Sequence, residues 1–168
     1  RFVVLEPSPR EVWAANFRDR IVQHIVYNRI KETVYRKLSP DTCACISGKG
    51  THYAANKAHK YVQSVTDNWK EDAWYLKCDF KNFFGSLNKN IIFNYVKALF
   101  KDDCKDTMWL LEKIIFHDPR TNYKNNSSQY KDSLIPKHKS LLYNAPNVGL
   151  PIGNILSQIL ANLILNKL

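Results

Sequence analysis

Apolar residues recur at helical spacing in several stretches of the chain. The first stretch predicts a helix from about Arg18 to Lys37, with a basic outer surface and an inner face of Ile21, Ile25, Val26, Ile30 and Val34. Thr51 is a suitable N-cap for a second helix, which carries Ala54, Ala55, Ala58, Tyr61, Val62 and Val65 on one face. Asn88 is a suitable N-cap for a third, which carries Ile91, Ile92, Tyr95, Val96 and Leu99. Met108 to Phe116 predicts a further apolar helix.

Strict alternation of apolar and polar residues marks Trp74 to Phe80. Trp74, Leu76, Cys78 and Phe80 would face one side of a buried strand, and Tyr75, Lys77 and Asp79 the other. Near the start, Phe2 to Leu5 is extended and apolar, and Pro7 and Pro9 prevent a helix before Arg10. The polar segment from Asp118 to Ser140 predicts a loop or loose hairpin that reaches outward. These patterns together predict an α+β fold that is mainly helical.

The extent of the chain gives expectations about its organisation. With 168 residues, 45% of them apolar, it has enough material for one domain and part of a second. It begins at Arg1 and stops at Leu168 inside an apolar helical run, so we expect a piece of a longer protein. No apolar stretch approaches the roughly 20 residues of a membrane-spanning helix, and no secretory signal is present, so a membrane partner is not expected.

The charge balance predicts an anionic partner. Twenty-five Lys and Arg against fifteen Asp and Glu give a net charge of +10, which favours nucleic acid. Lys49, between two glycines at a helix start, is placed to hold a phosphate, although a flexible turn with a solvated lysine gives the same pattern. The four cysteines follow neither a zinc spacing nor a disulfide framework, which predicts reduced thiols in a cytoplasmic protein.

Four segments, in order, carry a resemblance to a known family. They are REVWAANFRDRIVQ (10–23), ACISGKGTHYAANKA (44–58), KCDFKNFFGSL (77–87) and GLPIGNILSQILANLILN (149–166). They resemble two fingers motifs and two palm motifs of bacterial reverse transcriptases, which are RNA-directed DNA polymerases. Ile152 with Ser157 and Gln158 is most similar to the enzymes of diversity-generating retroelements. The resemblance implies fingers in 1–72, the first part of the palm in 73–168 with a helical and loop insertion at about 88–146, and no thumb.

The resemblance also implies a chemistry, in which a primer 3′-hydroxyl attacks the α-phosphate of a deoxynucleoside triphosphate (dNTP) beside two Mg²⁺ ions. Asp79 would be a catalytic ligand of both ions, and the backbone carbonyl of Phe80 would help to hold one of them. Phe84 would be the steric gate against a 2′-hydroxyl, with Phe83 in the core. The remaining implied contacts are Arg10, Ile152 and Gly153 in the dNTP pocket, and Lys49, Lys57, Lys60 and Gln158 on nucleic acid.

Two of these positions carry further expectations. Ile152 stands where many relatives have glutamine, and because isoleucine offers only shape to the nucleotide, the resemblance implies error-prone copying. Arg10 would pack on the incoming base and reach its phosphates, with a solvated surface arginine as the alternative. The lysine often found upstream of this arginine has no match here.

The Tyr-x-Asp-Asp turn of the family, which carries the remaining catalytic carboxylates, is expected shortly after Leu168. Asp102 and Asp103 lack flanking apolar strands and are predicted to be solvated loop acids. We therefore expect this fragment to be inactive alone and, with unpaired sheet edges, to self-associate. The implied partners are an RNA template, a DNA primer, dNTP and an accessory protein in the bacterial cytoplasm. Two alternatives stay open: a non-catalytic RNA-binding scaffold, and a generic basic α+β domain with another anionic partner.

Overall fold

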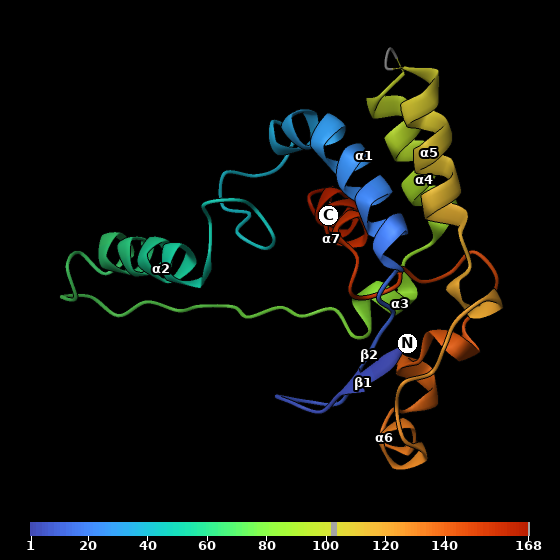
Figure 1. Cartoon of the computed structure of the whole chain (residues 1–168). Coiled ribbons are helices and arrows are strands. Elements are labelled where there is room, and N and C mark those ends of the chain that lie inside the picture. The colour runs from blue at the N-terminus through green and yellow to red at the C-terminus, as the bar shows by residue number, and fades with distance from the viewer. Residues whose placement is uncertain (102–103, 168) are drawn as a thin grey trace. The chain divides into compact units, whose positions relative to one another are not determined.

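The computed structural model, which describes residues 1–101 and 104–167, is an α+β protein, about half helical, with one short two-stranded sheet (Figure 1). Its elements are β1 (Phe2–Val4), β2 (Arg10–Val12), α1 (Phe17–Tyr35), α2 (Thr51–Val65), α3 (Phe83–Ser86), α4 (Lys89–Leu99), α5 (Lys105–Phe116), α6 (Gln129–Ser133) and α7 (Ile155–Leu165). Short 3₁₀ turns lie at Pro119–Thr121, Lys137–Lys139 and Leu141–Tyr143. The predicted loop acids Asp102 and Asp103 lie outside the described residues.

The chain divides into two compact units. The first comprises Arg1–Lys37 with Asn82–Leu168, and the second comprises Leu38–Lys81. These units are groups of residues that pack together, and they do not test a functional division. The predicted division into fingers and palm at 72/73 therefore stays a prediction. Each unit is described by itself below.

The core of the first unit lies among four helices, because α1 packs on α7 and α5, and α4 packs on α5. Their large, fully buried apolar side chains are Val26, Ile30 and Val34 of α1, Ile92 and Val96 of α4, Leu111 and Ile115 of α5, and Leu156, Ile159, Leu160 and Leu163 of α7. Helices α1, α4 and α5 were predicted within a few residues of these bounds, and α7 was predicted as an apolar helix near the end of the chain. The predicted cap of α4 is also confirmed, since the Asn88 side chain accepts hydrogen bonds from Asn90 N and Ile91 N.

The inner face of α1 differs from the prediction at three positions. Ile21 and Ile25, placed inside from their spacing, are 47% and 51% exposed, whereas Gln23 is buried. The buried stripe of α1 runs through Gln23, Val26, Ile30 and Val34, and the two isoleucines lie outside this arc. Helical spacing identified the helix, and the positions of α5 and α7 decided which arc is covered.

The predicted extended start is one strand of a hairpin. β1 and β2 pair antiparallel with Val3 opposite Glu11, and the prolines lie in the connection between them. Val3 and Glu11 are both buried, so the hairpin packs one face inward. A buried carboxylate such as that of Glu11 requires hydrogen-bond or ion-pair partners, and Arg1, Ser140 and Leu141 supply them.

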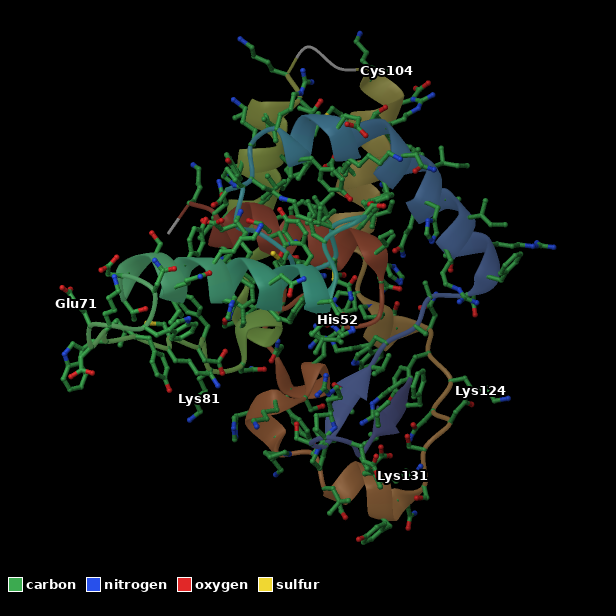
Figure 2. All side chains as sticks on the ribbon, turned by 90° about the vertical axis from the view of Figure 1, so that its left-hand side faces the viewer. His52, Glu71, Lys81, Cys104, Lys124 and Lys131 are labelled. Carbon is green, nitrogen blue, oxygen red and sulfur yellow. The ribbon has the colours of Figure 1, made fainter. Side chains whose placement is uncertain are left out.

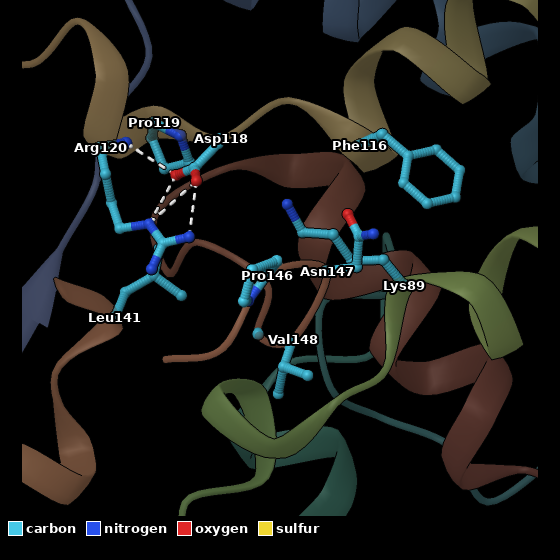
Figure 3. Close-up of a pocket in the computed structure, with 10 residues that line it drawn as sticks. Lys89, Phe116, Asp118, Pro119, Arg120, Leu141, Pro146, Asn147 and Val148 are labelled. Atoms are coloured by element: carbon cyan, nitrogen blue, oxygen red, sulfur yellow. Dashed lines mark hydrogen bonds and ion pairs between the residues drawn. The ribbon is translucent and has the colours of Figure 1, made fainter. Parts of the chain in front are cut away.

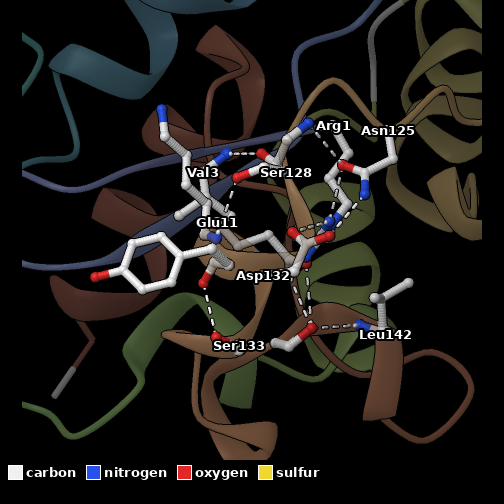
Figure 4. A network of polar contacts seen from close by, with 12 residues as sticks. Arg1, Val3, Glu11, Asn125, Ser128, Asp132, Ser133 and Leu142 are labelled. Atoms are coloured by element: carbon white, nitrogen blue, oxygen red, sulfur yellow. Dashed lines mark hydrogen bonds and ion pairs between the residues drawn. The ribbon is translucent and has the colours of Figure 1, made fainter.

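A polar network, here called the Glu11 clamp, joins the hairpin to the segment 118–140 (Figure 4). The Glu11 carboxylate pairs with the Arg1 guanidinium and accepts hydrogen bonds from Ser140 Oγ at 3.1 Å and Leu141 N at 2.8 Å. Arg1 Nη1 also donates to Asp132 Oδ1 at 2.7 Å. Burial lowers the pKa of Arg1, but the hydrogen bonds that Arg1 donates to Glu11 and Asp132 outweigh it and raise that pKa. The segment therefore does not reach outward as predicted, because the clamp holds it against the hairpin.

The predicted strand at Trp74–Phe80 is wrong. Residues 72–80 form neither helix nor strand, and Trp74, Tyr75 and Leu76 are almost fully exposed. Figure 2, which labels Glu71 and Lys81 near the ends of this stretch, shows its side chains projecting from an extended ribbon. A strand is stabilised by pairing with a neighbour, and the two strands of the described residues pair with each other. The second unit has little core of its own, since α2 buries none of its residues.

Candidate functional site

The turn at residues 149–154 is held from both sides within the first unit. On one side, Gly149 N donates to Leu87 O at 2.7 Å and Leu150 N donates to Phe84 O at 2.8 Å, which fixes the turn to α3. On the other side, Trp13 N donates to Ile152 O at 2.7 Å, which fixes it to the chain just after β2. Three segments of the resemblance thus meet here, although up to 140 residues separate them along the chain.

Asn154 completes the attachment. Its Oδ1 accepts from Ala15 N at 3.2 Å and its Nδ2 donates to Trp13 O at 3.1 Å. An asparagine immediately before an apolar helix is typical of an N-cap, yet this side chain does not cap α7. It binds the backbone that follows β2 instead, so the start of α7 is left without a side-chain cap.

Both glycines of the turn are required by its geometry. Gly149 has φ +95° and Gly153 has φ +114°, in the region that side chains rarely adopt. A Cβ at Gly153 would lie 2.7 Å from Val12 Cγ1, and one at Gly149 would lie 2.4 Å from Asn144 Nδ2. These contacts show how closely the turn approaches the elements around it.

Of the predicted residues of the dNTP pocket in the first unit, Ile152 and Gly153 belong to this turn, Phe84 accepts a hydrogen bond from it and Arg10 begins β2. Phe84 and Ile152 are half-buried, while Gly153 and Arg10 are exposed, and Gln158 is half-buried on α7. Phe84 packs edge-to-face on Phe83 with ring centroids 5.8 Å apart. Phe83 is half-buried like Phe84, so burial does not separate the predicted core ring from the predicted gate.

The other predicted residues lie in the second unit, where Asp79 is exposed and its carboxylate has no hydrogen-bond or ion-pair partner among the described residues. Phe80 is 50% exposed. No group of three His, Cys, Asp or Glu side chains in the described part of the chain is placed to hold a metal ion. These residues therefore do not fit a complete two-metal site, and Asp79 stays a candidate for one ligand.

The predicted phosphate-binding lysines already have partners within the second unit. Lys57 pairs with Asp41, and both Lys49 and Lys57 donate to the carbonyl oxygen of Pro40, at 2.9 and 3.0 Å. The hydrogen bond to Asp41 raises the pKa of Lys57, and the Lys57 and Tyr61 hydrogen bonds lower the pKa of Asp41. Lys60 is exposed. A phosphate at Lys49 would have to replace the Pro40 contact.

A hollow of ≈ 300 Å³ opens beside the turn and is lined by Arg20, Gln23, His24, Gly153, Asn154, Ile155 and Gln158. Only Gly153 and Gln158 were predicted site residues. Arg20 and Gln23 belong to the first segment of the resemblance, and His24 follows it directly. The three recur at i, i+3 and i+4 on α1, which places them on one face. The helical spacing of these three polar residues could have identified this face from the sequence, but the apolar residues between them drew attention to the opposite interpretation of the helix as a core element.

Comparison of the chain with known proteins identified no family. No protein-family model, characterised protein or solved structure matches it. In the described residues, no helix is long and apolar enough to cross a membrane. None of the four cysteines, all within the described residues, forms a disulfide, and Cys78, predicted inside a strand, is exposed. A functional proposal for this chain therefore rests on its own residues and on the geometry of the site, because no relative contributes to it.

A second, smaller cavity of ≈ 60 Å³ lies where α4 begins, beside Lys89, Asp118 and Arg120 (Figure 3). Lys89 is buried and its Nζ donates to His117 O at 2.8 Å. Burial lowers the pKa of Lys89, Asp118 partly opposes this, and Arg120 adds to it. Asp118 and Arg120 form an ion pair at 2.6 Å, and Arg120 Nη1 donates to Asn144 O. The Asp118–Arg120 pair beside the cavity thus holds Asn144, in the loop that leads into the turn.

We expect the ion pair of Asp118 and Arg120 to make the stability of the fold depend on pH in the acid range. The hydrogen bonds from Arg120 hold the pKa of Asp118 at about 2, below its usual 3.8. Because the folded-state pKa is lowered, the pair stabilises the fold above about pH 4, and this stabilisation is lost as the pH falls towards 2. An NMR titration of the Asp118 carboxyl should give a midpoint near 2. In Arg120→Gln the midpoint should return towards 3.8, and an unchanged midpoint would contradict the assigned cause.

Proposed function

We propose that this chain is the nucleotide-binding part of an RNA-directed DNA polymerase, with fingers in 1–72 and the first part of the palm in 73–168. The observation that most supports the proposal is the attachment of the turn to α3 and to the end of β2, through Leu150 N to Phe84 O at 2.8 Å and Trp13 N to Ile152 O at 2.7 Å. A nucleotide pocket needs such rigid attachment, because discrimination between sugars depends on groups held to within about 0.5 Å.

Within this proposal, three side chains act on the incoming nucleotide. Phe84, anchored to the turn through its own carbonyl, fills the space that a 2′-hydroxyl would occupy. Ile152 presents an apolar surface of fixed shape and no hydrogen bond, which favours error-prone insertion. Arg10 begins β2 with an exposed guanidinium, which suits a triphosphate because it donates several hydrogen bonds and keeps its charge.

The proposal assigns Asp79 as one carboxylate of a metal site that the described residues do not complete. Mg²⁺ prefers several oxygen ligands at short range, and a single exposed carboxylate does not provide them. We therefore propose that polymerisation requires further carboxylates and that the 168-residue chain alone does not extend a primer.

A non-catalytic RNA-binding scaffold is the second candidate. The observation that favours it is the same lack of a three-ligand group in the described part of the chain, together with the net charge of +10. Phosphate contacts give affinity for RNA without any catalytic step. Asp79 has no role in a scaffold, so its substitution separates the two candidates.

Primer extension tests the proposal. On a polyadenylate template with Mg²⁺ and thymidine triphosphate, the complete polymerase that carries this segment should extend a primer, and Asp79→Ala should reduce extension below detection. Asp67→Ala is the matched control, because Asp67 is an exposed acid of the same unit that pairs with Lys70, and it should extend normally. Extension by Asp79→Ala, or robust extension by the 168-residue chain alone, would contradict the proposal. RNA binding without extension, where a known polymerase extends, would favour the scaffold.

A further inference from the structure

The segment 74–80 exposes large apolar side chains on an extended backbone. Trp74, Tyr75 and Leu76 are 100%, 90% and 88% exposed, and Cys78 and Asp79 are exposed as well. The backbone of residues 73–79 forms no hydrogen bond with another described residue. An extended segment with open backbone groups and exposed apolar side chains is a template for pairing with another strand.

The charges of this segment are complementary to those of a second copy of the same segment. Lys77 and Asp79 stand on either side of Cys78. In a two-fold symmetric antiparallel pair, the contact of one residue with another is made twice, once in each direction. If Cys78 lies opposite Cys78 of the second copy, each Lys77 therefore lies opposite an Asp79. Opposite charges in this position stabilise a pair of strands, and like charges destabilise it.

The same register also aligns the apolar residues. Leu76 lies opposite Phe80 of the second copy, on the face that carries Cys78, and residues directly opposite each other share a face. On the charged face, Tyr75 lies opposite Lys81, and a lysine over a tyrosine ring is a favourable contact. One register thus gives apolar contacts on one face and opposite charges on the other.

Other registers of the two copies are less favourable. Pairs centred on Lys77 or on Asp79 place like charges opposite each other, and a pair centred on Leu76 forms no ion pair. A pair centred on Phe80 is short, because α3 follows within a few residues. A shift of one strand by a single residue places the apolar row of one copy against the polar row of the other. Charge complementarity therefore selects the pair centred on Cys78.

We propose that two copies of this chain associate through residues 75–81, which form a two-fold antiparallel ribbon centred on Cys78. The ribbon is smaller than a standard protein interface, and two-stranded ribbons are only marginally stable, so the dimer is weak, with a dissociation constant on the order of 100 μM. The inference does not depend on the proposed polymerase activity. Because the ribbon uses the Asp79 carboxylate, pairing and metal binding by Asp79 exclude each other.

Sedimentation equilibrium of the reduced 168-residue chain, without metal ion or nucleic acid, measures the association. The mean mass should rise from monomer to dimer over about a hundredfold range of concentration. Lys77→Asp should weaken the dimer about 10-fold or more, because each attraction becomes a repulsion, and Asp79→Lys should do the same. The double variant Lys77→Asp with Asp79→Lys restores opposite charges and should return the dissociation constant to within about 2-fold of the wild type.

Lys60→Asp is the matched control for charge. It makes the same change at an exposed position of α2, outside the ribbon, and should not weaken the dimer. Both Lys60→Asp and Lys77→Asp lower the net charge of +10 by two, which reduces the general repulsion between copies. A weaker dimer in Lys77→Asp is therefore opposite to the effect of general charge.

A cysteine cross-link tests the register. In a variant whose other three cysteines are serine, diamide should join Cys78 of the two copies in a disulfide, as each thiol gives up a proton and an electron to the diamide. Opposite positions bring these thiols within reach of each other. A variant that keeps only Cys45, another exposed thiol of the same unit, should cross-link about 10-fold more slowly, at the rate of random collision. This test needs no charge reversal, so it decides the proposal if a charge variant fails to fold.

The results decide the proposal as follows. A dimer that a single charge reversal weakens and the double variant restores supports it, as does preferential cross-linking through Cys78. A chain that stays monomeric at every concentration overturns it, and so does a double variant that remains as weak as the single ones. Equal cross-linking through Cys45 and Cys78 overturns the register. Slow amide exchange of residues 75–81 in a monomer would also overturn the proposal, because another part of the protein would then cover the segment.

Discussion

Replacement of Glu11 by alanine should lower the free energy of unfolding of the first unit by about 3–5 kcal/mol. Glu11 and Arg1 are both buried, and the Glu11 carboxylate also accepts from Ser140 Oγ and Leu141 N. Its removal leaves a buried guanidinium and two buried donors without this acceptor. Since a domain is stable by only about 5–15 kcal/mol, the loss should be visible as a lower midpoint in urea unfolding.

Asp132→Ala is the control for this prediction. Asp132 also pairs with Arg1, but its side chain is 29% exposed, so its loss should cost about 1 kcal/mol or less. The Glu11 variant should also release the segment 118–140, which hydrogen exchange of its backbone amides would detect. Equal effects of the two substitutions would show that burial of Glu11 does not dominate the clamp.

Gly149→Ala should destabilise the first unit by about 2–4 kcal/mol, through backbone strain and overpacking together. Gly149 has φ +95°, and a Cβ there would lie 2.4 Å from Asn144 Nδ2 and 2.6 Å from Leu141 Cδ1. If the Asn144 side chain gives way, its hydrogen bonds to Gly85 O and Val148 O break, and if the turn moves instead, the hydrogen bonds of Gly149 N and Leu150 N break. The measurement is denaturant unfolding, accompanied by amide exchange at Leu150.

Gly85→Ala provides the comparison. A Cβ at Gly85 would meet only atoms of the Asn82 side chain, which can rotate away, and Gly85 has no positive φ. We expect a loss of about 1 kcal/mol or less, because alanine also has the higher helix propensity. If Gly149→Ala were no more destabilising than Gly85→Ala, then the close approach of Gly149 to Asn144 and Leu141 would be incorrect.

The candidate site was only partly foreseeable from local patterns. The glycines of the turn and the apolar helix after it follow from the residues themselves, since Gly and Pro interrupt a helix and a run of Leu and Ile resumes it. That Leu150 would bond to Phe84, and Ile152 to Trp13, did not follow, because these pairs lie 66 and 139 residues apart. The burial of Gln23 Oε1 without a hydrogen-bond partner in the described part of the chain did not follow either, because burial of a polar residue depends on its neighbours.

The sequence by itself determined the longer helices α1, α2, α4, α5 and α7 and the N-cap at Asn88, because each depends on residues within a few positions along the chain. The tertiary structure alone decided the rest. It covered one arc of α1 and left Ile21 and Ile25 outside. It left residues 72–80 without a partner strand, and it held 118–140 against the hairpin through Glu11. Strand pairing, ion pairing and burial all join residues distant in sequence, so no local pattern contains them.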